Sequence, residues 1–251
     1  MESDPSRFYQ HLYQKLAPSH ETAMRKTAFV EAVADVCQRT GARTAIEFGC
    51  GRGLDAAALL ALIPIRILAT DNVNGMLQAV PQHVERRYLD VRATSLQAPG
   101  YFDVSYCANL VHLLSTDEKS TFYQNAWSLT KPAGAFLCLT ASLEQLRNRF
   151  LSSYFPSAYD IDAQRYLSIE RNIAMMKVAG FTRFERRVLA LGVRDVGDDV
   201  SYLCGRTCSI VHLLQTDEVE RGLAQMAIDT KKLSKSKRTR EWKRTLVVAW
   251  R

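Results

Sequence analysis

Several features that assign chains to other protein classes are missing from this one. No stretch of the 251 residues approaches the roughly 18 consecutive apolar residues that cross a bilayer. Residues 1–7 are polar and begin acidic, and no apolar segment of the kind found in secretory signals follows them. These absences predict a cytoplasmic protein with no membrane partner.

The six cysteines lack the spacing of a metal site. No Cys-x-x-Cys pair occurs, and no cluster of histidines completes a zinc pattern. Cys50, Cys107 and Cys138 lie in or beside apolar runs, where cysteine commonly acts as a small buried hydrophobe. Cys204 and Cys208 could share one helix face, but two thiols alone are a weak sign of a metal. We therefore expect neither a metal nor a disulfide.

The basic charge is not spread over the whole chain. The formal net charge is +7, and the segment 231–244 holds eight basic residues and the single acid Glu241. The remaining 25 basic and 25 acidic residues balance. A short basic run is more often a solvated loop than a nucleic-acid site, and this one has no aromatic residue except Trp242. Binding of nucleic acid or protein through this segment stays the alternative function.

Hydrophobic periodicity indicates strands that alternate with helices. Helical spacing runs through residues 7–40, with an interruption at 17–20, and short apolar runs typical of buried strands follow it. We expect later helices at 54–62, 76–80, 118–129, 168–179 and 218–228, and strands at 44–48, 65–70, 86–89, 102–107, 135–140, 181–191 and 245–250. Such alternation predicts an α/β fold with a mainly parallel sheet, whose ligands bind at the carboxyl ends of the strands.

A glycine-rich turn follows the first expected strand. Gly49, Gly51 and Gly53 allow the backbone to pass close to a ligand, although this pattern alone could be a tight turn. Asp71 ends the next strand about 20 residues further on, the spacing at which a carboxylate accepts both hydroxyls of a ribose. Asp90 ends the strand after that and could accept from an adenine amino group. Together these residues predict a nucleoside site.

Glu47 indicates which nucleoside the site would bind. It stands two residues before the first glycine, where the pyrophosphate of a dinucleotide would disfavour a carboxylate. A ligand with an amino group and a sulfonium would favour it, and S-adenosylmethionine (SAM) carries both. The Gly-x-x-x-x-Gly-Lys-Ser/Thr loop that holds nucleotide phosphates does not occur.

These residues resemble the motifs of class I SAM-dependent methyltransferases. Residues 45–53 (AIEFGCGRG) look like motif I, 71–77 (DNVNGML) like the second motif, and 89–91 (LDV) like the third. Residues 102–114 and 129–134 resemble the later motifs of the UbiE-like, small-molecule branch (methyltransferase types 11 and 25). The chain departs from the family pattern at Ala133, where Pro-Gly-Gly is usual, and at Trp127, where arginine is common.

The resemblance implies a single methyltransferase domain over residues 1–251. Its expected fold is Rossmann-like, with a seven-stranded, mainly parallel sheet, helices on both faces and an antiparallel last strand. The expected parts are N-terminal helices (1–40), a SAM-binding core (41–142), a lid or substrate region (143–180), and C-terminal strands with a helical insertion (181–251). A peripheral helix pair is an equally good reading of the aromatic segment 143–168.

The resemblance also implies which residues hold SAM and its product, S-adenosylhomocysteine. Glu47, Gly49 and Gly51 would hold the methionine part, Asp71 and Asn72 the ribose, and Asp90 with Val91 the adenine. The channel to the methyl group would be lined by Cys107, Ala108 and Asn109, and the cofactor residues would also include Phe48, Cys50, Gly53 and Met76.

The acceptor side is less determined by the sequence. His112 is the best candidate base near the strand ends, and Tyr9, His11 and Tyr13 on the first helix could close over the site. A generic loop histidine and a plain surface helix are the alternatives. We predict a small-molecule O-, N- or C-methyltransferase, because the Asn-Pro-Pro-Tyr-type motif expected of nucleic-acid base methyltransferases does not follow the fourth strand. The acceptor, the methylated atom and the oligomeric state stay open.

Overall fold

The computed structural model describes residues 5–16, 27–93, 100–204 and 208–251. The elements of the core alternate as the sequence predicts: α2 (Thr27–Thr40), β1 (Thr44–Phe48), α3 (Leu54–Leu62), β2 (Arg66–Asp71), α4 (Asn74–Gln78), β3 (Glu85–Tyr88), β4 (Phe102–Ala108), α5 (Thr116–Leu129), β5 (Thr130–Thr140), α9 (Ile169–Ala179), β6 (Arg183–Asp195) and β7 (Thr239–Trp250).

The seven strands form one sheet in the order β3-β2-β1-β4-β5-β7-β6. All the pairs from β3 to β5 are parallel, whereas β7 runs antiparallel to both β5 and β6. From β1 the chain runs outward to β3 and then crosses to β4 on the other side of β1, so the topological switch point lies between β1 and β4. The predicted Rossmann-like fold with an antiparallel last strand is confirmed.

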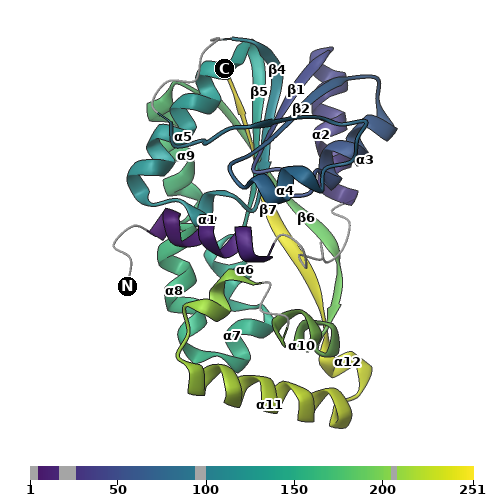
Figure 1. Ribbon diagram of the computed structural model, residues 1–251, viewed down its shortest axis with the longest axis vertical. Helices are drawn as coiled ribbons and strands as arrows, with labels where there is room; N and C mark the ends of the chain where they lie inside the picture. The colour runs from purple at the N-terminus through teal and green to yellow at the C-terminus, as the bar shows by residue number, and fades with distance from the viewer. Residues whose placement is uncertain (1–4, 17–26, 94–99, 205–207) are drawn as a thin grey trace.

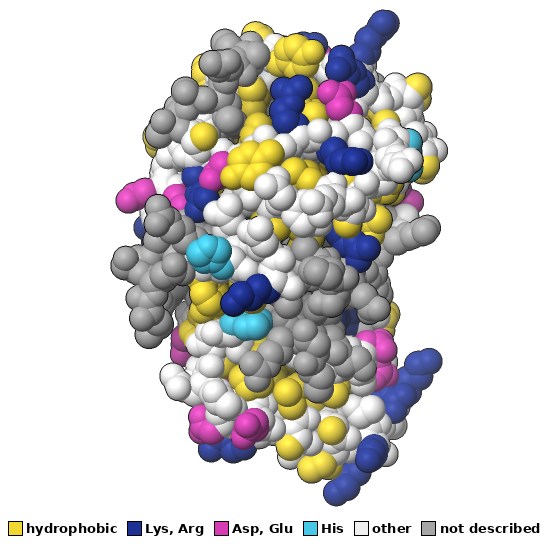
Figure 2. All heavy atoms as spheres, in the orientation of Figure 1, with side chains coloured by type: hydrophobic (Ala, Val, Ile, Leu, Met, Phe, Trp, Pro, Cys, Tyr) yellow, Lys and Arg dark blue, Asp and Glu magenta, His cyan; other side chains and the backbone are white. Residues whose placement is uncertain are grey.

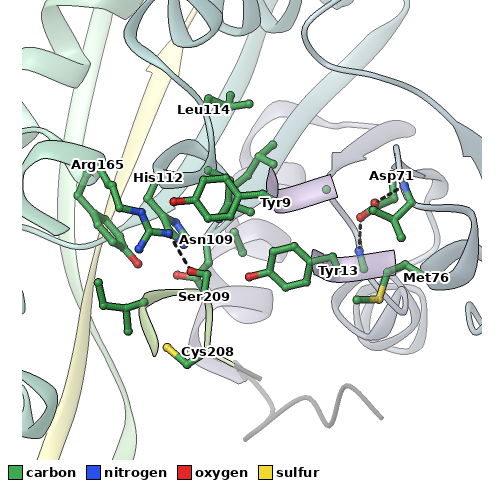
Figure 3. A pocket seen from close by; sticks show the side chains of 18 of the residues that line it. Tyr9, Tyr13, Asp71, Met76, Asn109, His112, Leu114, Arg165, Cys208 and Ser209 are labelled. Carbon is green, nitrogen blue, oxygen red and sulfur yellow. Dashed lines mark hydrogen bonds between the residues drawn. The ribbon is translucent and has the colours of Figure 1, made fainter. Parts of the chain in front are cut away.

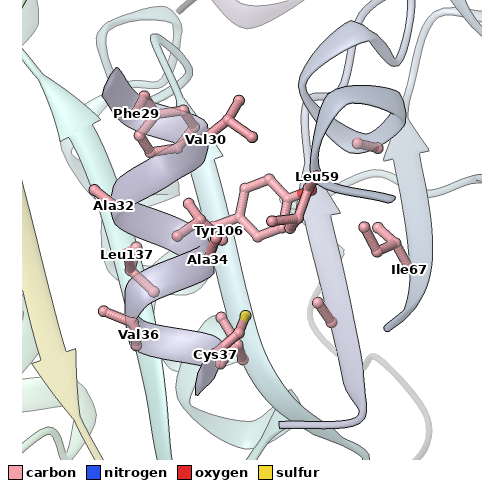
Figure 4. Packing of buried hydrophobic residues seen from close by; sticks show 14 of the residues in the cluster. Phe29, Val30, Ala32, Ala34, Val36, Cys37, Leu59, Ile67, Tyr106 and Leu137 are labelled. Atoms are coloured by element: carbon pink, nitrogen blue, oxygen red, sulfur yellow. The ribbon is translucent and has the colours of Figure 1, made fainter. Parts of the chain in front are cut away.

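Helices cover both faces of this sheet. Successive side chains of a strand point to opposite faces, and in the central strands both sets are apolar. On one face, α2 and α3 pack over Ile67, Tyr106 and Leu137 (Figure 4). On the other face, α5 and α9 pack over the strand residues next in sequence to these, such as Leu68 and Phe136. The alternation buries the central strands from both sides, which fixes the positions of their carboxyl ends.

Six further helices form a lower lobe from two separate parts of the chain (Figure 1). The first part holds α6 (Leu143–Arg147), α7 (Phe150–Tyr154) and α8 (Pro156–Tyr166), and the second, between β6 and β7, holds α10 (Val196–Cys204), α11 (Thr216–Lys232) and α12 (Lys235–Arg238). Phe155 and Ala158 from the first part share an apolar cluster with Leu203, Ile210 and Met226 from the second. We call this lobe the lid.

The segment 143–180 that the sequence groups together divides between the lid and the core. Its last helix, α9, packs on α5 against the sheet. Ser168 accepts a hydrogen bond from the Arg171 backbone N–H (3.1 Å) at the start of α9, and Gly180 ends the helix with φ 115°.

The last two strands are longer than the sequence pattern predicts. β6 and β7 continue past the sheet as a two-stranded ribbon towards the lid, so the strand boundary expected at residue 245 lies at Thr239 instead (Figure 1). Polar and charged side chains fill this ribbon because it is not covered on both faces, and the apolar signal of a strand is lost there.

Two further features concern membranes and cysteines. None of the helices in the described ranges is long and apolar enough to cross a membrane. α10 ends at Cys204, and Cys208 lies outside it at the N-cap of the 3₁₀ turn Ser209–His212, so the two cysteines that could have shared one helix face do not lie on one helix. Within the same ranges, no three His, Cys, Asp or Glu side chains gather in a way that could hold a metal ion.

Candidate functional site

A cavity of about 330 Å³ lies where the sheet meets the lid. One end is formed by the loops after β1, β2, β3 and β4. The other end is formed by α8, α10, the 3₁₀ turn Ser209–His212 and the ribbon of β6 and β7. Helix α1 (Pro5–Leu16) lies between the sheet and the lid (Figure 1), and its Tyr9 and Tyr13 side chains line the cavity between the two ends (Figure 3). We call the two ends the strand end and the lid end.

The glycine-rich turn shapes the strand end. Gly51 has φ +54° and lines the cavity, and an added Cβ would meet no other atom of the chain within 4 Å. A side chain at this position would therefore project into open space next to the turn. At Gly53 (φ +69°) a Cβ would approach Val80 Cγ1 to 2.8 Å. The turn thus needs glycine both for its conformation and for close approach.

Asp71 holds this turn from the end of β2. Its Oδ2 accepts the Gly51 backbone N–H (2.9 Å), and its Oδ1 accepts the Val73 backbone N–H (2.9 Å) (Figure 3). Burial raises the pKa of the carboxyl group, while the amide hydrogen bonds act in the opposite direction. A half-buried carboxylate on a cavity wall is a strong acceptor for ribose hydroxyls.

Asp90 faces a guanidinium group and not the cavity. Arg92 donates from Nε to Asp90 Oδ1 (2.8 Å) and from Nη2 to Asp90 Oδ2 (2.5 Å). Burial raises the pKa of Asp90, but the hydrogen bonds from Arg92 outweigh it and the net pKa is lowered. Val91 and Arg92 line the cavity while Asp90 does not, so the adenine contact predicted for Asp90 would need its carboxylate to turn away from Arg92.

The structure gathers most of the predicted cofactor residues around one space. The cavity is lined by Gly49, Cys50, Gly51, Asp71, Asn72, Met76, Val91, Ala108 and Asn109. Its lining does not include Glu47, Phe48, Gly53, Asp90 or Cys107.

Strand geometry explains why Glu47 and Phe48 lie beneath the lining. Successive side chains of β1 point to opposite faces of the sheet. Phe48 therefore packs on Phe122 (ring centroids 5.4 Å apart), while Glu47, 2% exposed, receives a hydrogen bond from the Tyr106 hydroxyl (3.5 Å).

His112 lies between the two ends of the cavity. It follows β4 in a short 3₁₀ turn (Val111–Leu113), and its ring stacks on Tyr166 of α8 with centroids 4.4 Å apart and planes 4° apart. Its Nδ1 is buried and has no hydrogen-bond partner within the described part of the chain. Burial lowers its pKa well below the ordinary value, and the charges of Arg165, Arg244, Lys119 and Arg149 lower it further. The surroundings of His112 therefore favour the neutral ring, and its Nδ1 is available to a ligand.

Helix α1 presents one face to the cavity and the other to solvent. Tyr9 and Tyr13 are four residues apart and both line the cavity, with the Arg165 guanidinium 5.0 Å from the centroid of the Tyr9 ring. Gln10 donates to the Asn72 carbonyl oxygen (3.1 Å), which ties the helix to the strand end. His11 is two residues from each tyrosine, so it points away from the cavity and is exposed.

The lid end contains charged residues that the sequence did not identify as site residues. Four arginines and two aspartates line it: Arg149, Arg165, Arg194, Arg244, Asp162 and Asp199. Asp162, 1% exposed, is shared by Arg149 and Arg165. These residues come from distant parts of the chain and form no motif. Only Arg244 lies in a segment that the charge pattern singles out.

The basic segment 231–244 does not form one surface. Arg238 pairs with Asp195 (2.8 Å), Lys243 pairs with Glu241 (2.7 Å), and Arg244 lines the cavity. Lysines at 231, 232, 235 and 237 are exposed around α11 and α12. Figure 2 shows dark blue basic side chains at the lower end of the molecule, where Figure 1 places these helices. The segment is therefore divided between structural ion pairs, the cavity and a solvated end.

The strand end fits SAM in its chemistry. A carboxylate for the ribose hydroxyls, a glycine turn whose open side faces the cavity, and apolar side chains such as Met76 and Val91 for the adenine all line one wall. Asn109 (φ +54°) lines the same wall where β4 ends, and its Oδ1 is buried with no partner within the described residues. An unpaired acceptor there suits a ligand with donor groups.

Comparison with known families gives one match. Residues 45–134 match the family model described as a methyltransferase domain, which covers β1 to the start of β5 and so every loop of the strand end. No curated protein sequence matches the chain.

Solved structures with the same fold are numerous and distant in sequence. A protein of Anabaena variabilis named as a methyltransferase of an antibiotic biosynthesis pathway has 16% identity and a TM-score of 0.71, over 90% of this chain and 98% of its own. Phosphoethanolamine N-methyltransferase 2 of Haemonchus contortus, solved with phosphomonomethylethanolamine and S-adenosylhomocysteine, has 12% identity and a TM-score of 0.57, over 96% of this chain and 56% of its own.

A third similar structure is named for a different reaction. The [4+2]-cyclase SpnF has 15% identity and a TM-score of 0.58, over 98% of this chain and 96% of its own. At these identities the likeness shows the fold, and the reaction must be argued from the site.

Proposed function

We propose that this chain is a class I SAM-dependent methyltransferase and that it transfers the methyl group to an oxygen, nitrogen or carbon atom of a small-molecule metabolite. The observation that supports a small acceptor most strongly is the shape of the site. One continuous cavity runs from the glycine turn to a lid end covered by α8, α10 and α1. A folded macromolecule could not enter such a space, whereas a small molecule would lie next to the methyl donor.

SAM supplies an electrophilic methyl group on a sulfonium, and the protein must align the acceptor with it. Alignment of the reacting atoms supplies much of the rate in such a displacement. Ala108 and Asn109, at the end of β4, and His112 one turn further on would line the path between donor and acceptor.

We propose His112 as the group that removes the acceptor proton. It is held neutral and its Nδ1 has no partner within the described ranges, so the nitrogen can accept a hydrogen bond from a hydroxyl or amine. His112→Gln keeps polarity at this position but cannot take a proton. If His112 is the base, this variant lowers kcat by about 100-fold or more and leaves the affinity for SAM unchanged.

The test of the function is a methyl-donor assay with isotopically labelled SAM against a metabolite extract, with mass detection of the labelled product. We expect a labelled small molecule in the wild type, and none in Asp71→Ala because that variant should not hold the donor. Calorimetry with SAM checks binding directly. A wild type that binds no SAM, or an Asp71→Ala variant with unchanged affinity, would rule out the proposed site.

We favour a metabolite over nucleic acid because the basic segment 231–244 presents mainly the exposed lysines around α12 to solvent. Neutralising Lys231, Lys232, Lys235 and Lys237 should leave transfer to the small acceptor unchanged. RNA or DNA binding that weakens with salt and disappears in this variant would support the alternative instead.

A further inference from the structure

The lid end of the cavity carries an excess of positive charge. Its charged lining residues are four arginines (149, 165, 194 and 244) and two aspartates (162 and 199), a formal balance of +2. At the strand end, two arginines (52 and 92) face two aspartates (55 and 71), and the charges balance. The excess is therefore confined to the side where the acceptor would lie.

The two aspartates are already used by three of the arginines. Asp162 pairs with both Arg149 and Arg165 (2.7 Å to Arg165 Nη1), and Asp199 pairs with Arg194. Arg149 and Arg165 are 15% and 11% exposed at their side chains, and each has a buried Nε without a hydrogen-bond partner in the described parts of the chain. Although both arginines are paired with Asp162, their Nε–H groups can still donate hydrogen bonds to a ligand.

Arg244 is the arginine with the least compensation. Its Nη1 donates to its neighbour's carbonyl oxygen, that of Lys243 (3.0 Å), and its Nε is buried with no partner. No carboxylate in the described ranges forms an ion pair with it. Its guanidinium and that of Arg194 lie 5.4 and 5.5 Å from the centroid of the same Trp242 ring. Burial lowers the pKa of Arg244, and the positive charges of Arg149 and Arg194 lower it further, a repulsion that a bound anion would offset.

We propose that the methyl acceptor carries an oxyanion, a carboxylate or a phosphate, and that Arg244 binds it at the lid end with the help of Arg149 and Arg194. A planar guanidinium binds either group with two parallel hydrogen bonds. This proposal rests on the proposed function and names the class of its substrate. The anion would hold one end of the acceptor on the ribbon of β6 and β7, and the atom to be methylated would face Asn109 and His112.

Two further observations agree with an anionic acceptor. SAM carries a net positive charge through its sulfonium and amino groups, so with SAM in place the whole cavity is strongly cationic before the acceptor enters. Three lid-end arginines, Arg165, Arg244 and Arg149, also lower the pKa of His112 through their charge, after the larger effect of burial. An oxyanion among them would offset that charge and allow His112 to take a proton more easily.

The experiment titrates the wild type, saturated with S-adenosylhomocysteine, with inorganic phosphate and separately with benzoate, at constant ionic strength kept by NaCl. Calorimetry should show binding of at least one of the two, and the tighter one identifies phosphate or carboxylate as the acceptor group. Arg244→Gln should weaken that binding about tenfold or more. Arg186→Gln removes the same charge from an exposed site on β6 (side chain 55% exposed) and should change nothing.

Three results would overturn the inference while leaving the proposed function in place. The wild type binds S-adenosylhomocysteine but neither anion; or Arg186→Gln weakens anion binding as much as Arg244→Gln; or Arg244→Gln weakens SAM binding, which would assign the cluster to the cofactor carboxylate. If Arg244→Gln does not fold, Arg244→Lys keeps the charge without the planar fork and should show a smaller loss. A wild type that binds no SAM would instead overturn the proposed function.

Discussion

The two ends of the cavity are built in different ways. At the strand end, short loops at the carboxyl ends of β1, β2, β3 and β4 supply backbone groups and a few side chains, and the sheet fixes their positions. At the lid end, side chains from α7, α8, the β6–β7 ribbon and α10 form the lining, and they hold one another through ion pairs. A frame of strands suits a constant cofactor, while interlocked side chains suit a variable acceptor.

Because of this difference, substitutions at the two ends should have separable effects. Changes at the strand end should alter SAM binding and leave the lid folded. Changes at the lid end should alter stability or anion binding and leave SAM affinity unchanged.

The largest effect is expected from Asp162→Asn. The carboxylate is 2% exposed and neutralises Arg149 and Arg165 together. Its loss leaves two buried guanidinium groups without a counter-charge, which should lower the free energy of unfolding by about 3–5 kcal/mol. Thermal unfolding should show a Tm lower by about 10 °C.

The matched control for this variant is Asp217→Asn. Asp217 is 70% exposed and pairs with Arg221 on the surface of α11 (2.8 Å), so its loss should change stability by less than about 1 kcal/mol. Equal Tm changes in the two variants would show that the buried cluster does not hold the lid together.

The next effect is a loss of SAM affinity in Asp71→Asn. The amide cannot accept two hydroxyl donors and two backbone N–H groups as the carboxylate can, so we expect Kd for SAM to rise about 100-fold. Calorimetry with SAM and with phosphate separates the two ends, because phosphate binding should not change. Asp90→Asn is the comparison, and its effect should be much smaller because Asp90 faces Arg92. If Asp90→Asn lowers the affinity for SAM more than Asp71→Asn does, Asp90 contacts the adenine as the sequence predicted.

A smaller effect concerns pH and His112. The pKa of this residue is lowered well below 6.5 in the folded protein and returns to its ordinary value on unfolding. Below pH 6.5 the unfolded chain takes up a proton that the folded chain does not, so stability falls as the pH falls from about 6.5. The slope due to this one group is at most about 1.4 kcal/mol per pH unit.

Denaturant unfolding at pH 7.5, 6.5 and 5.5 measures this slope. His112→Gln should lose less stability on acidification than the wild type. His83→Gln, at an exposed histidine, should behave as the wild type does. The assignment fails if His112→Gln and the wild type lose the same stability.

The smallest effect is expected from Gln10→Ala on α1. Gln10 donates to the Asn72 carbonyl oxygen (3.1 Å) and accepts from Arg92 Nη2 (3.4 Å), which ties the helix over the strand end. One neutral hydrogen bond contributes about 1 kcal/mol, so Kd for SAM should rise about fivefold, mainly through faster release. Gln14→Ala, at an exposed position one turn along, is the control. Stopped-flow release rates that do not differ would show that α1 does not retain the cofactor.

The sequence predicts the strand end well for a physical reason. The glycine turn directly follows its strand, and the carboxylate ends the neighbouring strand. The positions of these residues are therefore set by segments that are close together in the sequence. The order of the core elements and the caps of α9 follow from the same local rules. The family match, residues 45–134, covers this part of the chain and ends before the lid begins.

The lid end could not be predicted because it depends on contacts between distant residues. Arg149 and Asp162 meet Arg194 and Arg244 only after the β6–β7 ribbon has folded back from the sheet. The charge count drew attention to 231–244, but it did not show that Arg244 is the basic residue of that run that lines the described cavity. Likewise, helical spacing placed Tyr9 and His11 on one helix, and tertiary packing decided which of them faces inward.

The β6–β7 ribbon has a consequence for how a protein of this architecture could acquire new substrates. Arg194, Trp242 and Arg244 all lie on strands that are hydrogen-bonded into the ribbon and, through β7, to the central sheet. The helices 143–166 and 196–238 are inserted between elements of that frame. Mutation or exchange of these helices can therefore reshape the acceptor space while the point of attachment stays fixed. Proteins that evolve from such a scaffold would therefore come to accept molecules that differ in their uncharged part more readily than molecules that lack the charged group.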